Sequence, residues 1–373
     1  MVKPKERRKN ESSMRKKLNW GIIGTGNIAA KFAEGLSCLG EEACLYAVGS
    51  RELQKAEAFA APRGIPHACG SYEELVKDPE IDVVYIGVPH TFHRACAELA
   101  IKAGKHVLCE KPMCVNRKEA EKLQEAARKE GVFLMEAMWT KFLPVIQEVK
   151  KLLDAGAVGE ILGIEASFGF WNPFDEKARL YNKLLGGGAL LDVGIYPLNL
   201  ACFLMGKLPV KTESQAVLGE TGVDEINAML LTFEQENGKK VLAELRSACR
   251  ASQGCNAWIY GTKGKIWIPS FFNADKAVVE CYEEGTTREI VKAHRANGYE
   301  YEAMAVDACI REGKTECAVH TWKDTLDMLE LMDKMRNEWG VRYEDARTKK
   351  LRQVVTAVSD GANAATAVAE YLK

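Results

Sequence analysis

The stretch "LNWGIIGTGNIAAKFAEGL", residues 18 to 36, decides the fold of this chain. It opens with a short apolar run typical of a buried strand, and a glycine turn leads from that run into a segment with apolar residues at helical spacing. In the turn, Gly24 permits a tight bend, Gly26 lets the backbone approach a pyrophosphate, and Ala29 is small enough for close helix-strand packing. The helix N-terminus would face the phosphates, so this context favours dinucleotide binding over an ordinary glycine turn. The contacts predicted here are Gly24, Thr25, Gly26, Asn27 and Ile28.

Strand-like and helix-like segments alternate as far as residue 137. The alternation predicts right-handed crossovers and a parallel sheet, and therefore a Rossmann domain over residues 18 to 137. Ligands of such sheets bind at the carboxyl ends of the strands. The further expected strands are "ACLYAVGS", "IDVVYIGVP", "HVLCE" and "VFLME", and the expected helices cover residues 52 to 60, 91 to 103 and 116 to 130.

The end of the second predicted strand bears on the choice between NADP and NAD. An NAD site usually places Asp or Glu there for the ribose 2′-hydroxyl, whereas this chain has Ser50 and Arg51, with Lys55 one turn later. A hydroxyl and two cations suit a 2′-phosphate, so NADP is favoured and NAD remains possible. The alternative is that Ser50 caps the next helix and that Arg51 and Lys55 lie on a solvated face.

The stretch "HVLCEKPM", residues 106 to 113, ends a buried strand on Glu110, Lys111 and Pro112. Lys111 would lie on the rim where the nicotinamide end of the cofactor is expected. Desolvation beside a cationic ring would lower its affinity for a proton, Glu110 would restrain that change, and Pro112 would hold the lysine out of the helical region. The alternative is a lysine with its head in water.

The second half of the chain reads as an α+β domain, residues 138 to 344. Residues 141 to 155 form an amphipathic pattern, and a series of alternating strands begins at "ILGIEASFGFW" (161 to 171) and continues to about residue 282. Successive strands without helices between them predict a large, mostly antiparallel, open sheet. One face would pack on helices, and a partner subunit would cover the other, which predicts a homodimer. The alternative is an outer face polar enough to stay wet.

Several of these motifs together carry a family resemblance. "GIIGTGNIA", "SRELQKAEAFA", "IGVPHTFH", "CEKP" and "GGGALLDVGIYPL" resemble the Gfo/Idh/MocA oxidoreductases, from about residue 18 to about residue 343. Within that family the chain is most similar to the branch of dimeric dihydrodiol dehydrogenases, D-xylose dehydrogenases and glucose-fructose oxidoreductases. The resemblance implies a catalytic Lys111 with Asp192 and Tyr196 as partners, and contacts from Arg51 and Lys55 to the 2′-phosphate. Many relatives have histidine where this chain has Tyr196, and the tyrosine points to the dihydrodiol and sugar branch.

The predicted reaction is hydride transfer between the carbinol of a sugar or cyclic diol and the nicotinamide of NADP. Asp192 and Tyr196 are four residues apart, so on a helix both project from one face. Tyr196 would take the hydroxyl proton with its pKa lowered by Lys111, and Asp192 would orient Lys111 or bind a second substrate hydroxyl. Whether Lys111 or Tyr196 is the immediate base stays open. The alternatives are a helix-turn cap for Asp192 and a half-buried aromatic for Tyr196.

Other residues near the same rim are weaker candidates. Trp139, Phe170, Trp171 and Arg179 follow strand ends and would line a sugar or aromatic diol, although aromatics at such positions are more often core. Pro89, His90 and His93 follow the third strand near the expected nicotinamide ribose, where structural histidines are equally common. The full set of predicted cofactor contacts adds Ser50, Arg51, Lys55, Pro89, His93, Glu110 and Lys111 to the glycine turn, and no metal site is predicted.

Composition narrows the remaining possibilities. With 373 residues and a net charge of -1, the chain suits two globular domains and gives no reason to expect nucleic acid or an anionic membrane as a partner. No apolar run was expected to reach the length of a membrane span, and twelve scattered cysteines indicate reduced thiols in a cytoplasmic protein. Residues 1 to 17 read as a disordered basic tail. Residues 345 to 373 resemble the end of thioredoxin reductases and read as an appended tail.

Two readings from other classes compete with the dehydrogenase. One is an NADP-sensing binding protein that kept the fold and lost the chemistry, against which the intact Lys111, Asp192 and Tyr196 argue. The other is an NAD-dependent glycosidase that oxidises its sugar transiently. Stoichiometric release of reduced cofactor would exclude both.

Overall fold

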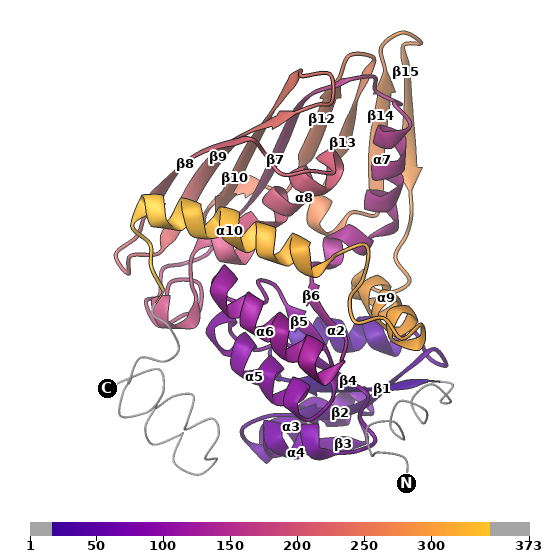
Figure 1. Ribbon diagram of the computed structural model, residues 1–373, viewed down its shortest axis with the longest axis vertical. Coiled ribbons are helices and arrows are strands. Elements are labelled where there is room, and N and C mark those ends of the chain that lie inside the picture. Colours follow the sequence, from indigo (N-terminus) through magenta and orange to yellow (C-terminus); the bar gives the residue numbers. More distant parts are fainter. Residues whose placement is uncertain (1–16, 344–373) are drawn as a thin grey trace.

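Two sheets organise the chain in the computed structural model, which describes residues 17 to 343 (Figure 1). The first sheet has six strands and the second has nine. Residues 1 to 16 and 344 to 373 lie outside the described part, and with them the two predicted tails except Lys17.

The first sheet is parallel throughout and has the strand order β3-β2-β1-β4-β5-β6. This order is that of a dinucleotide-binding Rossmann domain. Successive strands are added toward one edge of the sheet from β1 to β3 and toward the other edge from β4 to β6, so the strand order reverses between β1 and β4. The strands are β1 (Leu18–Ile23), β2 (Ala43–Gly49), β3 (His67–Cys69), β4 (Val83–Ile86), β5 (His106–Glu110) and β6 (Leu134–Ala137).

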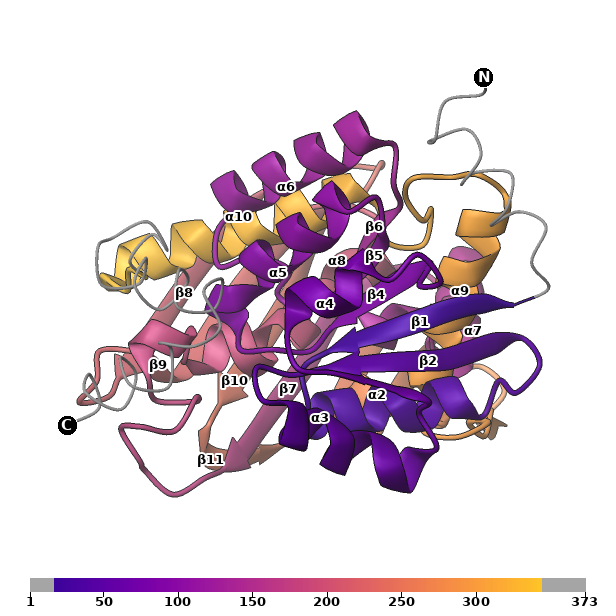
Figure 2. The same cartoon turned by 90° about the horizontal axis from the view of Figure 1, so that it is seen from below.

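Helices cover both faces of this sheet, with α2 and α3 on one side and α4, α5 and α6 on the other (Figure 2). The sheet is therefore buried on both faces, which explains why the sequences of β1 and β4 are nearly continuous apolar runs. The helices are α2 (Asn27–Ser37), α3 (Leu53–Ala60), α4 (Tyr72–Lys77), α5 (His90–Lys102) and α6 (Arg117–Glu130).

The second sheet has the order β15-β14-β13-β12-β7-β10-β9-β8, with β11 paired to β7 outside that path. It is mostly antiparallel, as predicted, but β7 and β10 at its centre run parallel. Its strands are β7 (Ile161–Trp171), β8 (Lys211–Leu218), β9 (Asp224–Glu234), β10 (Lys240–Ala248), β11 (Arg250–Gly254), β12 (Ala257–Gly261), β13 (Gly264–Ile268), β14 (Lys276–Cys281) and β15 (Thr286–Val291).

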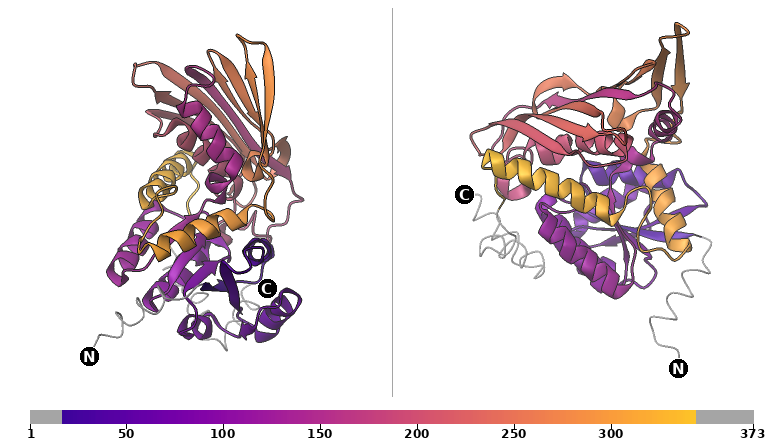
Figure 3. Two further views of the ribbon diagram at one scale, coloured as in Figure 1. Left: turned by 90° about the vertical axis from the view of Figure 1, so that its right-hand side faces the viewer. Right: turned by 45° about the horizontal axis from the view of Figure 1, so that its top comes forward.

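One face of the second sheet packs on helices. α7 (Pro144–Asp154), α8 (Ile195–Met205) and α10 (Trp322–Trp339) lie on this face, and no helix of the described chain lies on the other (Figures 1 and 3). α9 (Tyr299–Arg311) instead returns to the first domain and packs on α2. There Asp307 accepts a hydrogen bond from the Trp20 indole of β1 at 3.1 Å, which ties the end of the chain to its beginning.

The prediction that no apolar run approaches the length of a membrane span was wrong. Within residues 17 to 343, the segment Lys183–Met205 is long and apolar enough to cross a membrane. However, 89% of its most apolar window is buried inside the protein. α8 is apolar on all sides because it packs on β7 and β10 and also against α7 and α10, and such a helix belongs to the core.

Candidate active site

The glycine turn after β1 has the geometry that its sequence predicts. Gly24 has a φ of +109°, and a Cβ atom there would lie 2.6 Å from the carbonyl oxygen of Gly87 after β4. Its N–H donates to the Gly49 carbonyl at the end of β2. Only glycine fits this position, because the left-handed φ and the neighbouring backbone both exclude a side chain.

Gly26 fits the phosphate-binding role that the turn predicts. It precedes α2, whose first N–H groups receive no side-chain cap, and a Cβ at Gly26 would meet nothing within 4 Å. Thr25 and Ile28 are half-buried beside it, and Asn27 is exposed. The open space and the uncapped helix N-terminus are compatible with a bound pyrophosphate.

The residues after β2, which were predicted to favour NADP, carry a negative charge as well as positive charges. Ser50 is buried and donates its N–H to the Cys69 carbonyl, while Glu52 is the N-cap residue of α3, so the reading of Ser50 as the helix cap was wrong. Arg51 is exposed. The Lys55 ammonium pairs with the Glu52 carboxylate at 2.6 Å, so the site contains one acid as well as two cations.

Lys111 directly follows β5 and points toward the second domain. Its ammonium donates to the main-chain carbonyl of Asp192 at 2.6 Å and lies 3.9 Å from the Asp192 carboxylate. The Lys111–Pro112 peptide bond is cis. Burial lowers the pKa of Lys111 from its ordinary 10.5, and the carboxylates of Asp192 and Glu110 oppose that change in part.

Asp192 lies in a single π-helical turn, Leu190–Gly194, directly before α8. The Arg179 guanidinium binds its carboxylate at 2.9 Å, and Lys111 approaches the same oxygen. Burial alone would raise the pKa of Asp192, but these two cations outweigh it and hold the pKa at about 2. Asp192 is therefore ionised at neutral pH.

Tyr196 lies beside Lys111, although not as the sequence analysis expected. The ammonium lies over the Tyr196 ring, 4.9 Å from its centre, and the hydroxyl accepts a hydrogen bond from the Trp139 indole at 3.0 Å. Burial, aided by Glu110, raises the pKa of Tyr196 well above 10. The predicted lowering of this pKa by Lys111 is therefore wrong for this arrangement, because Lys111 faces the ring and not the hydroxyl.

Glu110 is buried behind Lys111 and contacts protein groups. Its carboxylate accepts from the Tyr85 hydroxyl at 2.6 Å and from the Lys111 N–H at 3.2 Å. Burial raises its pKa, and Lys111 and Tyr85 oppose that rise. These contacts hold Glu110 against Tyr85 and the Lys111 backbone, and its predicted contact with the cofactor stays a prediction.

The two histidines join segments of backbone. The ring nitrogens of His93 lie 2.8 Å from the Pro112 carbonyl and 2.7 Å from the Val88 carbonyl, so this fully buried residue connects the loops after β4 and β5. Burial lowers its pKa to about 4. His90 contacts the Gly186 carbonyl at 3.0 Å, and Pro89 is the N-cap residue of α5. His93 therefore holds the rim in place from inside the protein.

An aromatic wall surrounds Tyr196, and the sequence analysis named only part of it. Trp139 belongs to it, whereas Phe170 packs farther along β7 and Trp171 is 65% exposed. The wall also contains Phe168 and Phe272, whose rings lie 5.4 Å and 6.3 Å from that of Tyr196. The alternation of Ile164, Ala166 and Phe168 along β7 was the available signal for Phe168.

Comparisons with known proteins show to which family both domains are similar. Residues 18 to 138 match the family model described as "Oxidoreductase family, NAD-binding Rossmann fold", and residues 146 to 267 match the "GFO/IDH/MocA C-terminal domain". Trans-1,2-dihydrobenzene-1,2-diol dehydrogenase of Xenopus laevis is 39% identical over 331 residues, which cover 87% of this chain and 98% of that protein.

Two solved structures share both domains. Aldose-aldose oxidoreductase from Caulobacter crescentus, complexed with glycerol, has a TM-score of 0.78 at 26% identity and covers 87% of this chain and 98% of its own. A 3-ketoreductase from Actinomadura kijaniata, in complex with NADP and TDP-benzene, has a TM-score of 0.74 at 26% identity and covers 86% of this chain and 97% of its own.

The Rossmann sheet, the glycine turn and the rim residues define an NAD(P)-dependent oxidoreductase that acts on CH–OH groups. The chain belongs to the Gfo/Idh/MocA oxidoreductase family.

Proposed function

We propose that this protein is an NADP-dependent dehydrogenase of a cyclic diol or sugar, with Lys111, Tyr196 and Asp192 at its catalytic centre. The observation that carries the proposal is their convergence at one rim. The Lys111 ammonium contacts Asp192 and lies over the ring of Tyr196, and β5, which precedes Lys111, belongs to the same parallel sheet as β1, which precedes the open glycine turn. The aromatic wall and the dihydrodiol dehydrogenase relatives support a cyclic substrate.

The residues would divide the chemistry as follows. Gly24, Gly26 and the N-terminus of α2 would hold the pyrophosphate of the cofactor, which accepts hydride at C4 of its nicotinamide. Arg51 and Lys55 would bind the 2′-phosphate. Asp192 stays ionised and keeps Lys111 directed at the rim.

Lys111 is the better immediate base of the two candidates. Burial lowers its pKa, which makes the neutral amine more accessible, whereas burial raises that of Tyr196 and disfavours the phenolate. Tyr196 would therefore keep its proton and donate a hydrogen bond to the substrate oxygen. Trp139 would orient its hydroxyl from the other side.

Absorbance of reduced nicotinamide tests the proposal directly. Purified protein is incubated with NADP or NAD and a panel of trans-dihydrodiols, aldoses and inositols. We expect turnover with NADP and at least one diol or sugar, and a loss of about a hundred-fold or more in kcat for Lys111→Met. Lys102→Met, on the exposed end of α5, is the control and should keep full activity. Tight NADP binding without net reduction would instead support a sensor or a glycosidase.

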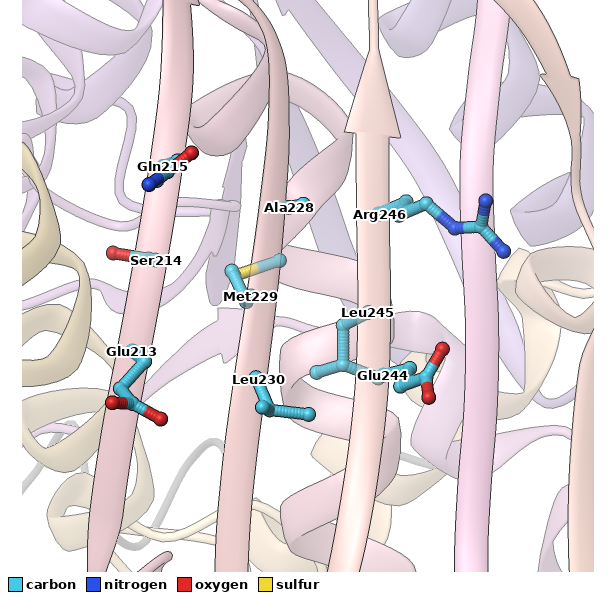
Figure 4. Close-up of a pocket in the computed structure, with 9 residues that line it drawn as sticks. All are labelled: Glu213, Ser214, Gln215, Ala228, Met229, Leu230, Glu244, Leu245 and Arg246. Atoms are coloured by element: carbon cyan, nitrogen blue, oxygen red, sulfur yellow. The ribbon is translucent and has the colours of Figure 1, made fainter.

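The bare face of the second sheet supports a homodimer. A row of outward residues crosses it, running from Glu213 through Leu230, Glu244 and Glu165 to Trp258. The pocket in Figure 4 lies on this face, although the side chains of Met229 and Leu245 are buried in the core. Its lining residues are Glu213, Ser214, Gln215, Ala228, Met229, Leu230, Glu244, Leu245 and Arg246. Stacked indoles of Trp258 and Trp267 add an aromatic surface suited to a second copy.

We place the protein in the cytoplasm. Its twelve cysteines are all free thiols, and eight of them are buried. Retention of free thiols at this density is typical of a reducing compartment.

A further inference from the structure

A chain of buried polar side chains lies between the first sheet and α10, away from the rim. It contains Glu136 of β6, Lys141 of the 3-10 helix Trp139–Phe142, and His320, Asp324 and Thr325 around the start of α10. Glu136 and His320 are 1% exposed and Lys141 is 6% exposed. We call Glu136, His320 and Lys141 the buried relay. Ionisable groups at this depth need partners, and these three are partners of one another.

The hydrogen bonds of the relay define where its protons lie. Glu136 Oε2 lies 2.9 Å from His320 Nε2 and accepts from the Thr325 hydroxyl at 3.1 Å. His320 Nδ1 lies 2.9 Å from the Lys141 ammonium, which is also 3.6 Å from the Asp324 carboxylate. An ammonium can only donate, so Nδ1 accepts, Nε2–H donates to Glu136, and the imidazole is neutral.

One end of the relay holds the backbone that carries Lys111. Glu136 Oε1 accepts from the N–H of Met113 at 2.8 Å, two residues after Lys111. The Met113 side chain is buried, and the intervening Pro112 offers its carbonyl to His93. The direction in which Lys111 leaves β5 therefore depends on where Glu136 places this backbone.

The other end holds the helix that carries Trp139. Lys141 lies two residues after Trp139 in the same single turn, Trp139–Phe142. Trp139 donates to the Tyr196 hydroxyl and stacks on Tyr299 with ring centres 4.3 Å apart. A shift of this turn would move the hydrogen bond that orients Tyr196.

We propose that Glu136, His320 and Lys141 are positioning residues that set the backbone of Lys111 and the turn of Trp139 relative to each other. The relay acts on the reaction without touching the substrate, because its two ends are the supports of the two groups that meet the carbinol. This inference rests on the proposed dehydrogenase function, in which Lys111 and Tyr196 act on one oxygen. Displacements of about 1 Å in such groups lower rates by about a hundred-fold.

Glu136→Gln and Lys141→Met test the proposal. Glutamine keeps the shape of Glu136 but is uncharged. Its amide faces the Nε2–H of His320 either with an N–H, which cannot accept, or with a neutral oxygen, which accepts more weakly than a carboxylate. Methionine has a volume close to that of lysine and lacks the N–H donors of Lys141. We expect kcat to fall ten-fold or more in both, with the Kd of NADPH, measured by fluorescence titration, unchanged within two-fold. Rescue in Lys141→Arg, which restores a donor, is expected to be partial.

Lys105→Met is the matched control. Lys105 is also a buried lysine, and it donates to the Ile81 carbonyl at 2.8 Å, but it precedes β5 and lies at the opposite end of that strand from Lys111. Its loss should lower the melting temperature as much as loss of Lys141 and leave kcat unchanged. If all three variants lost stability and kept wild-type kcat, the relay would be structural only and the proposal would be overturned.

Chemical labelling separates this result from the proposed function. Acetic anhydride acetylates free amines, and mass spectrometry of the Lys111 peptide across pH reports how exposed and how basic that amine is. A changed labelling profile in Glu136→Gln and an unchanged one in Lys105→Met would support the positioning role even if no substrate were turned over. Unchanged profiles in both would contradict it, whereas a wild-type protein inactive on every substrate would contradict only the dehydrogenase proposal.

Discussion

Replacing Glu302 by glutamine should stabilise the protein, and more strongly as pH rises. Glu302 is fully buried on α9, and neither of its carboxyl oxygens has a hydrogen-bond partner within the described chain. Burial, aided by the nearby charge of Glu110, raises its pKa well above 4.5. Its other neighbours include the phenols of Tyr85, Tyr196 and Tyr299, and no cation of the described residues counters the rise of its pKa.

The sign and size of the effect follow from proton linkage. Above its ordinary pKa of 4.5, Glu302 is ionised in the unfolded chain and protonated in the folded one. Folding must then take up a proton, so stability is complete below that pH and is lost as pH rises toward the folded pKa. The loss is about 1.4 kcal/mol per pH unit. Glutamine has no proton to take up and avoids this loss.

Thermal unfolding across pH measures this difference. The melting temperature of Glu302→Gln minus that of the wild type should increase by about 2 to 4 °C for each pH unit above 5. Glu300→Gln is the control, because Glu300 accepts from the N–H groups of Ala296, Asn297 and Gly298 and should lose stability on substitution. A difference for Glu302→Gln that stays flat or becomes negative with pH would refute the assignment of a protonated Glu302.

Three further predictions concern the cofactor site and the bare sheet. Gly26→Val should leave the melting temperature unchanged and abolish cofactor binding in a fluorescence titration. Gly24→Val should instead unfold the protein, because of the two glycines only Gly24 lies against the neighbouring backbone. Equal stability of the two variants would contradict this prediction. Arg51→Ala should raise the KM for NADP about ten-fold and leave that for NAD unchanged, a loss of about 1.4 kcal/mol, and equal effects on both cofactors would exclude a 2′-phosphate contact. Trp258→Asp should convert a dimer to a monomer in light scattering, while a wild-type monomer would exclude the dimer itself.

The sequence analysis predicted most of the elements of the first domain and most of the strands of the second sheet. It did not name α9, of 13 residues, or α10, of 18, and it also missed elements that are very short. β3, of three residues, and α4, of six, carry too little pattern to be distinguished from loop. The parallel pairing of β7 with β10 leaves no mark in either strand, because alternation shows burial and not the neighbour.

The candidate site divides in the same way. Lys111, Asp192 and Tyr196 could be named from their motifs, but their contacts could not. The spacing of Asp192 and Tyr196 suggested one face of an α-helix, whereas a π-helical turn changes that register and brings the Asp192 carbonyl to the lysine. Glu302 had no motif, since a buried acid without a partner is recognised only from its surroundings.

Lys111 lies between two carboxylates whose surroundings push their pKa values apart. Cations near Asp192 outweigh its burial and keep it ionised, while burial of Glu110 outweighs its hydrogen bonds and raises its pKa. Asp192 therefore restrains the Lys111 proton at neutral pH, and Glu110 restrains it more strongly as pH rises and that group ionises. Because the Lys111 ammonium donates to the Asp192 carbonyl at 2.6 Å, a substrate hydroxyl must share or replace this hydrogen bond to reach the amine. Substrate binding and the release of Lys111 for catalysis would thus be a single event.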